Sequence, residues 1–227
     1  PLTSLNPVFT VGDQIAEQVE LHMKVKPKES RDRAVEMLKL VGIPSPERRR
    51  LAQPFQVAMR DADQARLLVV AASLWSLPYR EFAYVAADLL RRHERQLAPS
   101  ALESLRELIT TDSWWDGVDP LSHVVGAIVR RHSDAAEEMD RWAADADLWV
   151  VRVAILHQLG WKADAQPERI FGYCAARAGH PDFFVRKAIG WALRDLARTF
   201  PDEVRWFVSE HRDELSPLSV REATKHL

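Results

Sequence analysis

Apolar residues recur at helical spacing along almost the whole chain, and this periodicity constrains the fold more than any other feature. Ala, Leu, Arg and Glu return every three or four positions, whereas alternating runs of Val, Ile and Thr are almost absent. Residues three or four apart lie on one face of a helix, so the pattern predicts amphipathic helices. Nearly half of the 227 residues are hydrophobic, which is enough for a substantial core. We therefore predict an all-α protein.

Prolines and one glycine mark the expected helix ends. The breaks contain Gly42, Pro46, Pro78, Pro99, Pro167, Pro181, Pro201 and Pro217. Proline suits the first turn of a helix, where its missing N–H costs nothing. Ser216 is the expected N-cap of the last helix. The expected helices cover residues 11–25, 28–41, 47–58, 62–76, 79–95, 100–110, 113–131, 134–144, 147–160, 167–178, 182–199, 202–211 and 218–226.

Helices of this length joined by short connections predict stacked antiparallel helix pairs. No strict sequence period is visible, which excludes consensus repeats of the tetratricopeptide or ankyrin type. A degenerate HEAT-like α-solenoid remains, and the concave side of such a solenoid suits a long partner.

Composition narrows the class of protein further. The single cysteine, Cys174, cannot form an internal disulfide, which predicts a reducing, cytoplasmic location. The chain shows no apolar run of about 20 residues and no signal segment. It begins at Pro1 rather than Met, as a fragment or a processed product would. Eight scattered histidines without zinc spacing, and the lack of a G-x-S-x-G elbow, lead us to expect no metal and no cofactor.

The stretch "TTDSWWDGVDP" places Trp115 and Asp119 four residues apart, on one face of a helix. Pro120 removes the N–H that would bond to the carbonyl of Asp116, so we expect the helix to kink and Asp119 to leave α geometry. The kink would aim the carboxylate towards a groove. In the alternative interpretation Asp112 or Ser113 caps the helix and Asp119 occupies a turn.

A basic row is predicted on the helix "DFFVRKAIGWALRDLARTF". Lys187, Trp191, Arg194 and Arg198 fall at i, i+4, i+7 and i+11. Arg and Lys can meet phosphates while an indole meets a sugar or base. The same pattern is typical of a solvated charged face with Trp191 at its edge, and both interpretations stay open. The formal net charge of −2 requires any nucleic-acid site to be a local basic surface.

Arg152 lies among apolar residues in "DLWVVRVAILHQLGW". A buried arginine needs a partner, because desolvating an unpaired charge is costly. It either forms a structural ion pair, with Asp119, Asp145 or Asp147, or grips a phosphate with its planar fork.

The segment "TSLNPVFTVGDQIAEQVELHMKVKPKESRDRAVEMLKLVGIP" resembles the helical subdomain of oligopeptide-transporter ABC ATPases, just after their Q-loop. No G-x-x-x-x-G-K-[ST] loop and no LSGGQ-like signature accompanies it, so nothing would cradle the phosphates of ATP. We therefore expect no nucleotide cofactor. We interpret residues 1–43 as an atypical N-terminal segment that caps the solenoid of residues 44–227.

From about Val41 onward the chain resembles the AlkD-like alkylpurine DNA glycosylases, which are HEAT-like. The resemblance is carried, in family order, by "GIPSPERRR", "LWSLPYREFAYVAADLL", "TTDSWWDGVD", "DLWVVRVAILHQL", "FFVRKAIGWALRDLARTFPDEV" and "LSPLSVREATKHL". It implies that an aromatic cleft of Trp115, Asp119 and Trp191 holds the sugar of the lesion nucleotide. It also places Arg152 near the lesion's backbone and makes Arg194 a DNA contact. The expected DNA-binding residues are Arg49, Arg152, Lys187, Arg194 and Arg198.

The resemblance implies an enzyme that excises N3- or N7-alkylated purines from duplex DNA and leaves the base stacked. We expect it to act as a monomer. The alternative is a non-catalytic helical scaffold that binds DNA or protein through the same concave face. A third interpretation, that the chain is a fragment of a transporter ATPase, rests on residues 1–43 alone.

Overall fold

The computed structural model describes residues 44–77, 79–225 and 227, and the described residues form helices and turns without a strand. Contacts divide the chain into two units, with a boundary after Leu51. Helix α3 (Ser45–Ala58) crosses that boundary and holds Pro54 inside it. The expected helices 11–25 and 28–41 lie outside the described residues.

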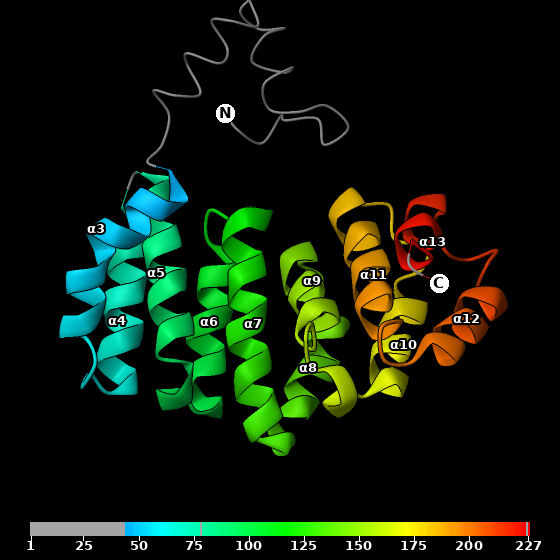
Figure 1. The fold of residues 1–227 in the computed structure, drawn as a ribbon, viewed down its shortest axis with the longest axis horizontal. Helices are drawn as coiled ribbons and strands as arrows, with labels where there is room; N and C mark the ends of the chain where they lie inside the picture. Colours follow the sequence, from blue (N-terminus) through cyan, green and yellow to red (C-terminus); the bar gives the residue numbers. More distant parts are fainter. Residues whose placement is uncertain (1–43, 78, 226) are drawn as a thin grey trace, which may run out of the picture. The chain divides into compact units, whose positions relative to one another are not determined.

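The unit from Ala52 onward is an array of helix pairs that follow one another along the chain (Figure 1). Its helices are α4 (Gln64–Trp75), α5 (Arg80–Arg92), α6 (Leu102–Thr110), α7 (Trp115–Arg131), α8 (Ala136–Ala143), α9 (Leu148–Leu156), α10 (Pro167–Ala176), α11 (Phe183–Leu196), α12 (Pro201–Glu210) and α13 (Pro217–Ala223). Short 3₁₀ turns cover Glu94–Gln96, Pro99–Ala101, Ser133–Ala135 and Lys162–Asp164.

The second helices of successive pairs form one continuous layer. Helix α5 packs on α7, α7 on α9, α9 on α11, and α11 on α13, while α4, α6, α8, α10 and α12 each contact the second helix of their own pair. This arrangement confirms the predicted all-α, HEAT-like solenoid of antiparallel helix pairs. The core is apolar and lies between the layers, and its largest fully buried side chains include Trp142, Phe207 and Leu89.

Local capping chemistry fixes where the helices begin. The side chains of Asp63, Asp147 and Asp182 accept backbone N–H bonds at the N-termini of α4, α9 and α11. Ser216 caps α13 by accepting from the N–H of Ser219, as predicted. Prolines occupy the first turns of α10, α12 and α13, where the missing N–H has no intrahelical partner.

Two glycines allow the helices of the second layer to approach closely. A Cβ at Gly126 of α7 would lie 1.8 Å from the carbonyl oxygen of His157, just after α9. A Cβ at Gly190 of α11 would lie 2.9 Å from the carbonyl oxygen of Ser219 on α13. Real Cβ atoms do not come that close to backbone, so glycine sets the spacing α7–α9 and α11–α13. The layer that results carries the predicted site residues of α7, α9 and α11.

Candidate functional site

Trp115 and Asp119 lie at the beginning of α7, one turn apart. Trp115 is the first residue of the helix and its side chain is 45% exposed. The expectation that Asp119 leaves α geometry is wrong, because α7 continues as a helix through Asp119 and Pro120 to Arg131. Pro120 deprives the carbonyl of Asp116 of one helical bond, and burial of Val118 and Leu121 on the packed side outweighs that loss.

The start of α7 also differs from the capping alternative. Trp114 is the N-cap residue and makes no side-chain cap bond. Asp112 adopts a left-handed conformation with φ of 46°. The hydroxyl of Ser113 bonds back to the carbonyl of Ile109. Neither Asp112 nor Ser113 is therefore the cap, and Asp119 is an ordinary helical residue.

Asp119 forms a bidentate ion pair with Arg152 of α9. Arg152 Nε lies 2.7 Å from Asp119 Oδ1, and its terminal nitrogen Nη2 lies 2.9 Å from Oδ2. The remaining nitrogen, Nη1, donates to the carbonyl oxygen of Phe184 at 2.6 Å. The side chain of Arg152 is 3% exposed and that of Asp119 is 14% exposed. The negative end of the pair therefore lies nearer the surface than the positive end.

This pair resolves the choice left open for Arg152. The other candidate partners are engaged elsewhere, since Asp145 accepts from Arg106 at 2.8 Å and Asp147 caps α9. The guanidinium fork of Arg152 is thus committed to holding Asp119 and the start of α11. A fixed fork gives the Asp119 carboxylate one orientation, because both of its oxygens are bonded.

An aromatic cluster of Trp114, Trp149 and Phe184 adjoins the pair. Ring centroids lie 6.0 Å apart for Trp114 and Trp149, 5.1 Å for Trp114 and Phe184, and 4.9 Å for Trp149 and Phe184. The guanidinium carbon of Arg152 lies 6.0 Å from the centre of the Phe184 ring. Three consecutive helices of the second layer therefore meet in one aromatic group at the Asp119–Arg152 pair.

Sequence reasoning missed Trp149 and Phe184 as site residues, although a signal exists. Each lies two residues after the aspartate that caps its helix, Asp147 for α9 and Asp182 for α11. Equivalent positions in successive helix pairs of a solenoid lie side by side. A capping aspartate followed by an aromatic residue in consecutive repeats therefore predicts such a cluster.

A second polar cluster holds the first turn of α7 against α5. Arg80 Nε lies 3.0 Å from Asp116 Oδ2, and the Tyr84 hydroxyl donates to the same oxygen at 2.5 Å. Burial, together with the hydrogen bond to Asp116, raises the pKa of Tyr84 to about 12. Because Asp116 follows Trp115 directly, the cluster fixes the backbone that carries the exposed indole. Sequence reasoning did not identify it.

Two cations of the predicted basic row, Lys187 and Arg194, lie on α11 and meet Glu222 of α13. Lys187 Nζ and Arg194 Nη1 contact the two carboxylate oxygens of Glu222 at 2.7 Å and 2.5 Å. Hydrogen bonding from Lys187 lowers the pKa of Glu222. Trp191 is half-buried and packs against the core. The Glu222 carboxylate thus pairs with two of the cations that were expected to contact phosphates.

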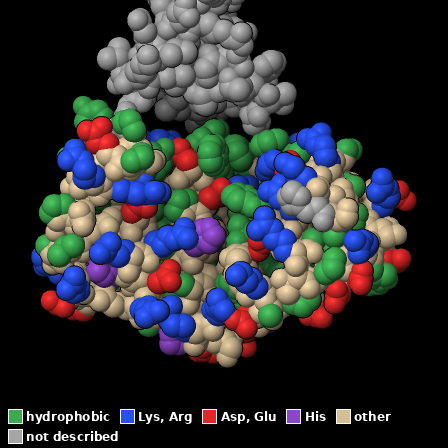
Figure 2. Space-filling model, in the orientation of Figure 1, with side chains coloured by type: hydrophobic (Ala, Val, Ile, Leu, Met, Phe, Trp, Pro, Cys, Tyr) green, Lys and Arg blue, Asp and Glu red, His purple; other side chains and the backbone are tan. Residues whose placement is uncertain are grey.

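The remaining predicted cations are exposed. Arg198 lies in the turn after α11, its side chain is 67% exposed, and it lies 3.9 Å from Asp195 at the end of that helix. Arg49 lies on α3, in the part of that helix that belongs to the first unit, and is exposed. Figure 2 shows Lys and Arg side chains spread over the face of the molecule drawn there, with Asp and Glu between them. Positive side chains are therefore present on this face, interspersed with carboxylates.

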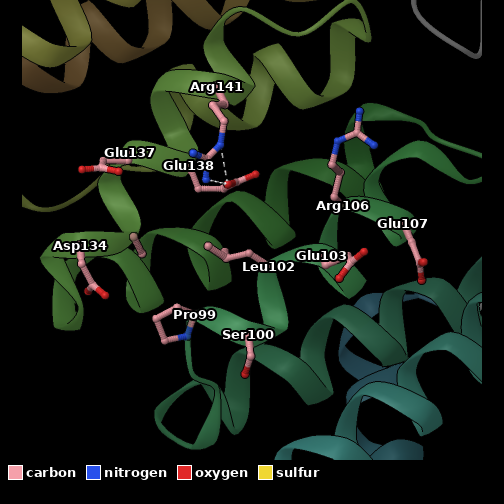
Figure 3. Close-up of a pocket in the computed structure, with 11 residues that line it drawn as sticks. Pro99, Ser100, Leu102, Glu103, Arg106, Glu107, Asp134, Glu137, Glu138 and Arg141 are labelled. Atoms are coloured by element: carbon pink, nitrogen blue, oxygen red, sulfur yellow. Dashed lines mark hydrogen bonds and ion pairs between the residues drawn. The ribbon is translucent and has the colours of Figure 1, made fainter.

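An acidic groove of about 740 Å³ lies beside α6 and α8 (Figure 3). It is lined by Pro99, Ser100, Leu102, Glu103, Arg106, Glu107, Asp134, Ala135, Glu137, Glu138 and Arg141. Arg141 is bonded to Glu138, and Arg106 to Asp145, so carboxylates dominate the groove. It repels a polyanion and contains none of the predicted site residues.

Neither a metal centre nor a membrane span is found in the part of the chain that the structure describes. Within it, no three His, Cys, Asp or Glu side chains are grouped so that they could hold an ion. None of its helices is long and apolar enough to cross a membrane. Cys174 is buried and unpaired, and burial raises the pKa of its thiol.

The family described as DNA alkylation repair enzyme matches residues 11–227 of the chain. The chain therefore belongs to the DNA alkylation repair enzyme family. The match begins well before Val41, so it includes most of the segment expected to be transporter-like.

Solved structures of similar fold cover nearly the whole chain. A predicted DNA alkylation repair enzyme from Enterococcus faecalis is 25% identical, covers 96% of this chain and 97% of its own, and superposes with a TM-score of 0.77. AlkD2 from Streptococcus mutans is 17% identical, covers 95% of this chain and 99% of its own, and gives a TM-score of 0.64. The second likeness shows a shared fold. The AlkD-like resemblance predicted from the sequence is confirmed.

Peptide transporters also match, over a short part of the chain. Oligopeptide transport ATP-binding protein OppD of Mycobacterium tuberculosis is 43% identical over 74 residues, which are 32% of this chain and 12% of that protein. Dipeptide transport ATP-binding protein DppD of Haemophilus influenzae is 50% identical over 58 residues, 26% of this chain and 18% of that protein. The chain thus spans less than a fifth of the length of either transporter protein.

Proposed function

We propose that this family member is a DNA glycosylase that excises cationic N3- or N7-alkylated purines from duplex DNA. The observation that carries the proposal is the placement of an exposed indole, Trp115, one helical turn from a carboxylate, Asp119, that a buried guanidinium holds in one orientation. Trp191, on α11, which packs against α9, completes the proposed aromatic cleft around the lesion nucleotide.

The reaction suits these few groups. An N3- or N7-alkylated purine already carries a positive charge, so it departs without a proton from a general acid. What remains is to stabilise the oxocarbenium-like sugar and to orient a water molecule, and one carboxylate can do both. Indole faces attract cations by about 0.5–2 kcal/mol each. Trp115 and Trp191 would therefore contact the sugar and the backbone while the base stays stacked.

Arg152 takes a positioning role in this proposal. Two of its nitrogens bind Asp119 and a third binds the Phe184 carbonyl, so each of the three nitrogens is bonded within the protein. It would hold the Asp119 carboxylate in one orientation, and the 14% of that side chain that is exposed would face the sugar. Lys187, Arg194, Arg198 and Arg49 are the proposed backbone contacts, and the protein would act as a monomer without a cofactor.

The scaffold alternative draws on the same contacts. The Asp119–Arg152 pair and the contacts of Lys187 and Arg194 with Glu222 would then serve folding alone, and DNA or protein would bind without being changed. The two proposals differ in whether Trp115 matters for turnover.

Trp115→Ala tests the proposal, with Trp206→Ala as a matched control. Trp206 lies on α12 and is 63% exposed, so both substitutions remove an exposed indole. We expect Trp115→Ala to slow release of 7-methylguanine from methylated duplex by at least about tenfold, the loss of one cation–π contact near the upper end of its range. Trp206→Ala should release 7-methylguanine at the wild-type rate. Equal rates for both variants would contradict the proposed site.

A further inference from the structure

A basic pocket of about 410 Å³ opens beside the second half of α7. Its walls come from the end of α5, from α7, and from the turn after α9. Its polar and aromatic lining consists of Arg91, Glu94, His123, Arg130, Arg131 and Trp161. We refer to it as the α7 pocket. None of its residues belongs to the site proposed above.

The arginines of the α7 pocket differ in how their charge is used. Arg131 donates to the carbonyl oxygens of Glu94 and Leu97, at 2.6 Å and 2.9 Å, so it keeps its full charge while its position is fixed. Arg130 is bonded to Asp164. Arg91 has no hydrogen-bond or ion-pair partner among the described residues, and its side chain is exposed.

His123 adds a second uncommitted group. Burial, and then the charge of Arg91, lowers its pKa, while the carboxylates of Asp119 and Asp195 act in the opposite direction. No hydrogen bond occupies its ring within the described residues. The lining holds three guanidinium groups and one carboxylate, that of Glu94, and Asp164 balances the charge of Arg130, so Arg91 and Arg131 leave the pocket positive. It is therefore an electropositive recess with unused donors.

The α7 pocket continues the face of α7 that carries Asp119. His123 is one turn beyond Asp119, about 6 Å along the helix axis, and Arg130 is about 16 Å beyond it at 1.5 Å per residue. The grooves of B-DNA are about 6 Å and 12 Å wide. A duplex with one nucleotide at Asp119 therefore presents other phosphates at the distance of the pocket.

We propose that the α7 pocket binds a backbone phosphate of the duplex, at a nucleotide other than the one that faces Asp119. Arg91 would turn its fork onto the phosphate, the His123 ring would donate to it, and the anchored Arg131 would supply fixed positive charge. The duplex is favoured over a free nucleotide because the pocket and Asp119 share one helix face. The inference rests on the proposed function only for the choice of DNA.

Binding of an undamaged duplex, measured by fluorescence anisotropy over a range of salt concentrations, tests the pocket. Arg91→Ala is compared with Arg92→Ala, which removes an exposed neighbouring arginine that does not line the pocket. We expect Arg91→Ala to weaken binding about tenfold, as loss of one charge-assisted hydrogen bond does. The log–log salt slope should become shallower by about 0.9, the value for one phosphate. Arg91→Lys should keep most of the slope, and Arg92→Ala should leave both quantities unchanged.

Other outcomes separate this inference from the proposed function. If wild type releases alkylpurines while Arg91→Ala binds duplex with wild-type affinity and slope, the pocket proposal is wrong and the glycosylase proposal stands. If wild type releases no alkylpurine but Arg91→Ala loses affinity for the duplex as expected, the glycosylase proposal is wrong and the pocket proposal stands. A second experiment measures the Tm of wild type and of Arg91→Ala at increasing concentrations of inorganic phosphate. Arg91-dependent stabilisation by millimolar phosphate, with duplex binding unchanged in Arg91→Ala, would make this a small-anion site and overturn the proposal.

Discussion

Replacing Asp119 by Asn removes one charge from the Asp119–Arg152 pair and leaves the other buried. Arg152 is 3% exposed, so water cannot replace the lost carboxylate. The Phe184 carbonyl and one amide oxygen would remain as acceptors, and neither carries a charge. Breaking a buried pair by removing one partner costs about 3–5 kcal/mol. For a domain of about 150–250 residues, each kcal/mol lowers Tm by about 2–4 °C. We therefore expect Asp119→Asn to lower Tm by about 6–20 °C.

Thermal unfolding followed by circular dichroism measures this loss, and the chain offers a control. Asp202 forms an ion pair with Arg205 on α12, and its side chain is 89% exposed. Exposed pairs contribute at most about 1 kcal/mol, so Asp202→Asn should change Tm by less than about 4 °C. The double variant Asp119→Asn/Arg152→Met removes both charges and should recover much of the stability. A Tm for Asp119→Asn within about 2 °C of wild type would refute the reasoning about the pair.

The same variant tests chemistry once stability is accounted for. Below its Tm, Asp119→Asn keeps the size of the side chain but cannot stabilise a developing sugar cation. We expect its single-turnover excision rate to fall by about 10²–10³, with DNA binding close to wild type. The double variant should fold well and remain slow, which separates the catalytic loss from the structural one. Excision at the wild-type rate by either variant would show that the carboxylate does not act on the reaction.

Two further predictions concern charges away from Asp119. Glu222→Gln frees Lys187 and Arg194 from a shared carboxylate, so duplex binding should tighten and its salt slope should steepen. An unchanged affinity and slope would place this row outside the interface. The fully buried His157 has a pKa lowered to about 4, chiefly by burial, against 6.5 in the unfolded chain. Because only the unfolded chain takes up this proton between those values, stability is lost as the pH falls from about 6.5 to 4. Denaturant unfolding at pH 7 and pH 5 should show a loss of about 2 kcal/mol in wild type that His157→Gln lacks.

The helices could be predicted from the sequence because their determinants are local. The 3.6-residue period, the prolines at helix starts and the Ser216 cap act within a few residues, and the observed helices follow them closely. Pro120 was misjudged for a related reason. A local rule predicts a change of geometry there, but tertiary packing of Val118 and Leu121 keeps α7 helical at the loss of one backbone bond.

The site depends on partners that are distant in the sequence. Periodicity showed that Arg152 is buried, yet it could not choose among three aspartates, because the choice depends on how α7 packs against α9. Glu222 lies 28 residues beyond Arg194 and reaches it only through the close approach at Gly190. Trp149 and Phe184 look like ordinary apolar positions until neighbouring helix pairs are stacked. Contacts between residues this far apart in the sequence can be identified only once the fold is known.

Release of base from two matched duplexes tests the central claim most directly. One duplex carries 7-methylguanine and the other carries uracil at the same position, and the protein is in excess so that one turnover is observed. The account predicts release of 7-methylguanine, which leaves as a cation, and little or no release of uracil, which needs a proton that no residue of the site supplies. Release of uracil as fast as 7-methylguanine would contradict the mechanism. Binding of the 7-methylguanine duplex without release of either base would contradict the proposed enzymatic function and favour the non-catalytic scaffold.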